Sequence, residues 1–88
     1  MHTYNYFVKS FLSEHVRDVR AKKGVSKADM AGCLRIDPRS YADLEKGISC
    51  FSAPSLLFYM SSMEKQELVN FMDSFRKAAA LLDDHAAV

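Results

Sequence analysis

The stretch from Val25 to Gly47 constrains the fold more than any other part of this chain, because two helix start signals lie close together in it. Ser26, with Asp29 three residues later, has the spacing of a capping box and predicts a helix over 27–34. The second start signal begins only three residues after Leu34. The stretch therefore predicts two short helices joined by a tight turn.

The second start signal is Asp37-Pro38. Asp accepts hydrogen bonds from free backbone amides, and Pro at the first helical position loses no hydrogen bond because its nitrogen carries no hydrogen. We predict a helix from Pro38 to about Lys46 that ends at Gly47, with Ile36 filling the gap at the turn. The predicted buried residues of the helix pair are Met30, Ala31, Leu34, Tyr41 and Leu44.

Two further helices are predicted on either side of this pair. From Thr3 to about Lys23 the apolar residues recur at helical spacing, and Gly24 can take the left-handed position that ends the helix. From Ala53 to about Ser61 the chain is apolar nearly all round, with Ser52 as its cap, so we expect this helix to be buried on most sides.

A fifth helix is predicted to begin with the spacing Ser61-x-x-Glu64 and to cover about 63–83, with residues 83–88 frayed. Its apolar residues recur at steps of four and three, which gives one continuous stripe. The stripe either packs onto the first and fourth helices or forms a dimer seam. Its members are Leu68, Met72, Phe75, Ala79 and Leu82.

Composition favours a single, entirely helical domain. The chain has 88 residues, of which 49% are apolar, with three Gly and two Pro, and Thr, Val and Ile are scarce. We therefore expect one all-α domain over 1–88, with a core module at about 16–62.

No cofactor, metal or membrane anchor is expected. Cys33 and Cys50 lie in no zinc-binding spacing and are too few for a disulfide framework, so both are expected to be buried or half-buried in a reduced, cytoplasmic protein. No apolar run approaches the roughly 20 residues that span a bilayer. His2, His15 and His85 are isolated, and no nucleophile elbow or glycine-rich oxyanion site is present, so we expect no enzyme.

Charge is distributed unevenly, although the formal net charge is only +1. Lys and Arg outnumber acidic residues over 16–50, whereas acidic residues are in excess over 51–88. The asymmetry has the sign expected of a module that faces nucleic acid and carries a tail that faces a partner.

The block from Arg17 to Phe58 resembles the lambda-repressor-like (Cro/XRE-type) helix-turn-helix family. Three segments carry the resemblance: R-A-K-K-G-V-S-K-A-D-M-A, L-R-I-D-P-R-S-Y-A-D-L-E-K-G and A-P-S-L-L-F-Y-M. They match the family's Arg in helix one, the Gly-apolar-Ser start and internal Ala of helix two, the Glu-basic-Gly end of helix three and the Pro-Ser-Leu start of helix four. The resemblance covers about half the chain and implies a five-helix bundle with helices two and three as the helix-turn-helix.

The resemblance also implies which residues contact base edges. In this family they lie at the start and one turn into helix three, and here they are Arg39, Ser40, Pro38, Asp43 and Ala42. Arg39 is the strongest, because a bidentate contact from Arg to guanine discriminates by about 1–3 kcal/mol. Pro38 and Asp43 depart from the family, since Pro has no donor and Asp is repelled by phosphates unless it accepts from a cytosine amino group.

Phosphate contacts are implied around the same motif. Lys27 begins helix two, where the family often holds a phosphate at the helix N-terminus, and Arg35 stands where Gly is usual in the turn. The full set is Lys27, Ser26, Arg35, Lys46 and Ser49. The alternative is that Arg39 and Lys27 are solvated surface residues. Glu45 is implied to form an ion pair with Arg17 or Arg20 of helix one.

The function implied is that of a cytoplasmic, prokaryotic or phage-type transcriptional regulator. It would bind a pseudo-palindromic operator in double-stranded DNA as a homodimer, with helix three in the major groove. The alternative is a helix-turn-helix fold used mainly to bind another protein, as in an antitoxin or an accessory subunit. Pro38 and Asp43 at two base-contact positions and the near-zero net charge favour this alternative.

Overall fold

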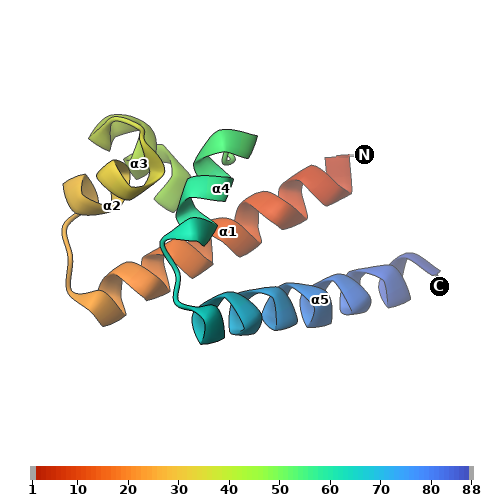
Figure 1. Cartoon of the computed structure of the whole chain (residues 1–88). Coiled ribbons are helices and arrows are strands. Elements are labelled where there is room, and N and C mark those ends of the chain that lie inside the picture. Colours follow the sequence, from red (N-terminus) through yellow and green to blue (C-terminus); the bar gives the residue numbers. More distant parts are fainter. Residues whose placement is uncertain (1, 88) are drawn as a thin grey trace.

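Five α-helices make up most of the structure, a computed structural model that describes residues 2–87, with side chains from Tyr4 to Asp83 (Figure 1). They are α1 (His2–Lys23), α2 (Lys27–Leu34), α3 (Pro38–Glu45), α4 (Ala53–Ser61) and α5 (Lys65–Ala87). No strand occurs between residues 2 and 87, so the prediction of an all-α chain is confirmed. None of these helices is long and apolar enough to cross a membrane.

Local capping interactions begin the three short helices, as predicted. Ser26 Oγ accepts from the Asp29 amide at 3.0 Å, and the Asp29 carboxylate accepts from the Ser26 amide at 3.2 Å, which completes the capping box of α2. Asp37 accepts from the Ser40 amide at the start of α3, and Ser52 accepts from the Ser55 amide at the start of α4. Each cap satisfies backbone donors that a helix leaves free at its first turn.

Glycines with positive φ end two of the helices. Gly24 follows α1 with φ +65°, and Gly47 follows α3 with φ +73°. Both angles lie in the left-handed region, where glycine has no steric cost. The predicted ends of these two helices are therefore confirmed to within one residue.

The start and the end of α5 differ from the prediction. Ser61 is the last residue of α4, and its hydroxyl donates to the Phe58 carbonyl at 2.8 Å instead of capping α5. Glu64 precedes α5 instead, and its carbonyl accepts from the Leu68 amide at 2.9 Å. The helix continues through Ala87, four residues beyond the predicted end at about 83, and Val88 lies outside the described residues.

One apolar core joins the helices. It contains all five residues predicted to be buried in α2 and α3, together with residues of α1, α4 and α5. Its members are Leu12, Val16, Met30, Ala31, Leu34, Tyr41, Leu44, Tyr59 and Phe71. Ile36 packs against this core at the turn, as expected.

Helix α4 is less buried than its composition predicts. Tyr59 and Ser55 are its buried residues, whereas Leu57 is 65% exposed and Phe58 is 39% exposed. A short helix that lies on the bundle turns one face inward, and an apolar composition does not by itself supply neighbours for the other faces. The expectation that α4 is buried on most sides is therefore wrong.

The long helices α1 and α5 run antiparallel, so the N-terminal end of α1 and the C-terminal end of α5 lie at the same end of the molecule (Figure 1). Aromatic rings join them: the Phe75 ring lies 5.5 Å from that of Phe7 and 5.2 Å from that of Phe11. Phe71 contacts the Phe11 ring at 5.9 Å. The two helices give the molecule an elongated shape of 42 × 28 × 22 Å.

Candidate nucleic-acid interface

Helices α2 and α3 pack closely across the tight turn at 35–37. Arg35 takes the left-handed conformation with φ 60°, and its amide donates to the Gly32 carbonyl at 3.2 Å. The Ile36 amide donates to the Ala31 carbonyl at 3.1 Å, and Ala31 itself is only 1% exposed. Ala31 is therefore buried within the helix pair, as the sequence predicts.

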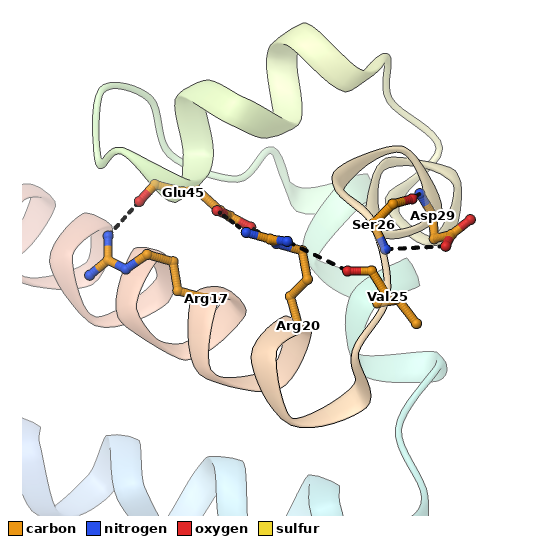
Figure 2. A network of polar contacts seen from close by, with 6 residues as sticks. All are labelled: Arg17, Arg20, Val25, Ser26, Asp29 and Glu45. Atoms are coloured by element: carbon orange, nitrogen blue, oxygen red, sulfur yellow. Dashed lines mark hydrogen bonds and ion pairs between the residues drawn. The ribbon is translucent and has the colours of Figure 1, made fainter.

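Helix α1 holds the C-terminal end of α3 through Glu45 (Figure 2). The Arg20 guanidinium pairs with the Glu45 carboxylate through two of its nitrogens, with Nη2 to Oε1 at 3.1 Å, so the predicted ion pair is formed by Arg20. Arg17 donates instead to the Glu45 backbone carbonyl. Arg20 also reaches the Val25 carbonyl at 3.5 Å, which ties the start of the α2–α3 unit to the same contact.

The carboxyl of Glu45 is ionised in this environment. Its side chain is 7% exposed and that of Arg20 is 28% exposed. Burial raises the pKa of Glu45, but Arg20, Tyr41 and Lys27 together outweigh this effect, so the pKa lies below its usual value. The pair therefore fixes the position of α3 against α1 at neutral pH.

The first turn of α3 is exposed. Pro38, Arg39 and Ser40 all face solvent, whereas Ala42 and Asp43, one turn later, are half-buried. The ion pairs among residues 4–83 are Arg20–Glu45 and Lys23–Glu67, so no described carboxylate neutralises Arg39. Of the five predicted base-contact residues, the three at the helix start are thus the accessible ones.

Asp37 and Ser40 are joined at this exposed helix start. The Ser40 amide donates to Asp37 Oδ1 at 2.9 Å, and the Ser40 hydroxyl donates to Asp37 Oδ2 at 2.8 Å. These two hydrogen bonds hold the pKa of Asp37 below its usual value.

The predicted phosphate-contact residues are all exposed, but Arg35 has another partner. Its guanidinium lies over the Phe58 ring, with Cζ 4.5 Å from the ring centroid, and it donates to the Cys33 carbonyl at 2.9 Å. Lys27 is the first residue of α2, Ser26 is its cap, and Lys46 is the residue that ends α3. Ser49 lies in the loop after α3, where its amide approaches the Asp43 carbonyl at 3.4 Å.

A half-buried histidine lies where α1, α4 and α5 meet. His15 Nδ1 is 2.6 Å from the Tyr59 hydroxyl, and the His15 ring lies 4.6 Å from Phe71. Burial lowers the pKa of His15, Asp18 and Glu67 oppose the shift, and Lys22 adds to it. Sequence patterns did not indicate the contact with Tyr59, because the two residues are 44 positions apart.

The predicted stripe of α5 is shared between the core and the surface. Leu68 and Phe75 pack inward, and Ala79 and Leu82 are half-buried, whereas Met72 is 42% exposed. An apolar groove of about 130 Å³ lies between α1, α4 and α5. It is lined by Val8, Leu12, Leu56, Met60, Phe71, Met72 and Phe75.

No three His, Cys, Asp or Glu side chains between Tyr4 and Asp83 are grouped as metal ligands. Cys33 is half-buried as expected, but Cys50 is exposed because it lies in the loop between α3 and α4, so that expectation is wrong. The side chains of His2 and His85 lie outside the described residues.

Comparisons of this chain with models of protein families, with curated proteins and with solved structures find no match.

Proposed function

We propose that this chain is a transcriptional regulator of the lambda-repressor-like, helix-turn-helix type, which binds operator DNA as a dimer with α3 in the major groove. The observation that carries the proposal is the closely packed α2–α3 pair, whose second helix exposes Arg39 and Ser40 at its N-terminal end. That end of a recognition helix contacts base edges when a helix-turn-helix docks on DNA.

The exposed cations around this pair support the same proposal. Lys27 is at the N-terminus of α2, where free backbone amides and the helix dipole also favour an anion, and Lys46 follows α3. Arg39 has no carboxylate partner among the described side chains and is available for guanine. In the proposed complex α2 and its neighbours hold phosphates while α3 contacts base edges.

A titration with mixed-sequence duplex DNA at several salt concentrations tests the proposal. Each phosphate contact contributes about −0.9 to the slope of log affinity against log salt, so we expect Lys27→Ala to make the slope less negative by about one. In a parallel titration with a guanine-containing sequence selected from random DNA, Arg39→Ala should weaken binding by about 1–3 kcal/mol. Lys77→Ala, which removes an exposed cation from α5, is the matched control and should change neither quantity.

A flat salt response that neither Arg39→Ala nor Lys27→Ala alters would overturn this function. It would favour the second candidate, a helix-turn-helix fold that binds another protein as an antitoxin or accessory subunit. The specific observation behind that candidate is the apolar exposure of α4, where Leu57 and Phe58 both face solvent. Pro38 and the half-buried Asp43 also weaken the base-contact surface of α3.

A further inference from the structure

The hydroxyl proton of Ser40 has a defined direction. An ionised carboxylate can only accept hydrogen bonds, so the 2.8 Å contact between Ser40 Oγ and Asp37 Oδ2 requires the serine to donate. The second oxygen, Oδ1, accepts from the Ser40 amide at 2.9 Å, which fixes the carboxylate in place. Ser40 therefore keeps only the lone pairs of Oγ for an external partner.

We propose that Asp37, by taking the hydroxyl proton, makes Ser40 a specificity-determining residue that accepts a hydrogen bond from a base amino group in the major groove. The inference rests on the proposed function. The amino groups available there are N4 of cytosine and N6 of adenine. Thymine O4 and the O6 and N7 atoms of guanine are acceptors and cannot donate to Ser40.

The charge of Asp37 disfavours the opposite arrangement. If Ser40 rotated its proton toward a keto group or a phosphate oxygen, Asp37 Oδ2 would lose its partner and would face a second electron-rich oxygen. Like-signed groups in contact at a binding surface are a common way to reject the wrong ligand. Asp37 thus excludes phosphate as well as keto groups from the partners of Ser40.

Ser40 and its neighbour Arg39 then recognise opposite kinds of hydrogen-bonding group on the bases. The Arg39 guanidinium has donors only and suits the two acceptors of guanine, whereas Ser40 as held by Asp37 has acceptors only. The predicted half-site therefore combines a guanine with an amino-bearing base, cytosine or adenine, at a separate position contacted by Ser40.

Asp37→Asn tests this assignment because it reverses the direction of the hydrogen bond between the side chain of residue 37 and Ser40 Oγ. Asn caps helices as well as Asp does, and its carbonyl can still accept from the Ser40 amide while its amide group donates to Ser40 Oγ. The serine proton is then released and can be donated to a keto group. Removing the Asp charge strengthens binding to all sequences alike, which does not alter the preference at one base position.

The experiment is a selection of bound sequences from random duplex DNA with the wild-type protein, Asp37→Asn, Ser40→Ala and the control Ser74→Ala, which changes an exposed serine of α5. We expect the wild type and Ser74→Ala to prefer adenine or cytosine over thymine or guanine at one position by about 3- to 10-fold. Ser40→Ala should lose this preference, and Asp37→Asn should shift it toward thymine or guanine.

The outcomes separate the two proposals. If enriched sequences appear but Ser40→Ala and Asp37→Asn select the same bases as the wild type, the role of Ser40 is wrong while DNA binding stands. If the wild type enriches no sequence and binds DNA without salt dependence, the proposed function fails and the inference fails with it.

Discussion

Glu45 is the residue through which α1 holds α3, because its carboxylate and its carbonyl accept from two different arginines. Removing the carboxylate would leave the partly buried Arg20 without its partner. We expect Glu45→Ala to lower the free energy of unfolding by about 1.5–3 kcal/mol, the range for hydrogen bonds to charged groups. Urea denaturation measures it, and Glu14→Ala, an exposed change on α1, is the control. Equal losses in the two variants would contradict a holding role for Glu45.

His15 predicts a pH dependence of stability. Its folded pKa lies below the ordinary value of 6.5. At a pH between these two values, His15 is mostly protonated in the unfolded chain and mostly neutral in the folded chain. Stability is therefore unaffected by this residue above about pH 6.5 and falls as the pH is lowered through that window.

The measurement for His15 is the difference in unfolding free energy between the wild type and His15→Gln, followed from about pH 7.5 to about pH 5. The wild type should lose more stability than the variant over this range, because Gln does not titrate and all other groups are common to both. Parallel curves would contradict the assignment of the effect to His15.

At the scale of the element, the turn between α2 and α3 is coupled to α4. The Arg35 guanidinium on the Phe58 ring is a cation–π contact, worth about 0.5–1 kcal/mol at an exposed site. We expect a double-mutant cycle with Arg35→Ala and Phe58→Ala to give a coupling energy in this range. Arg39 with Phe58 is the matched control pair, because Arg39 lies on α3 and the guanidinium on the Phe58 ring is that of Arg35. A coupling energy near zero for Arg35 and Phe58 would contradict an energetic coupling between the turn and α4.

The elements also differ in how far the sequence predicts them. Ser26, Asp37 and Ser52 signal the starts of α2, α3 and α4 because a cap acts on backbone groups only three residues away. Ser61 has the same spacing but belongs to the preceding helix, since its hydroxyl bonds to Phe58. Local patterns alone could not distinguish these two uses of a serine.

The contacts that position the candidate site between distant elements were harder to predict. The Arg20–Glu45 pair was anticipated only through the family resemblance, and the Arg35–Phe58 and His15–Tyr59 contacts had no local signal. The exposure of Leu57 depends likewise on which neighbours cover α4. Apolar composition indicates that a helix can be buried. The packing of the other helices determines which of its faces is buried.

At the scale of the whole molecule, the proposed dimer has a defined test. We expect a second copy to cover the apolar groove between α1, α4 and α5, because a two-fold operator with half-sites about 34–36 Å apart requires a two-fold protein. Met72 lines this groove and is 42% exposed, so Met72→Asp places a charge in the interface without entering the core.

Sedimentation at high micromolar concentration should give the mass of a dimer for the wild type and of a monomer for Met72→Asp, with unchanged helical content in both. Asn70→Asp adds a similar charge to an exposed position of the same helix and should remain a dimer. A monomeric wild type, or a Met72→Asp variant of unchanged mass, would exclude this groove as the dimer interface.

The antiparallel course of α1 and α5 also decides where this protein can be modified. The outer ends of both helices lie together, whereas α3 is bonded to the other half of α1 through Arg17 and Arg20 (Figure 1). A fluorophore attached near the outer end of either helix would therefore lie away from the half of α1 that is bonded to α3.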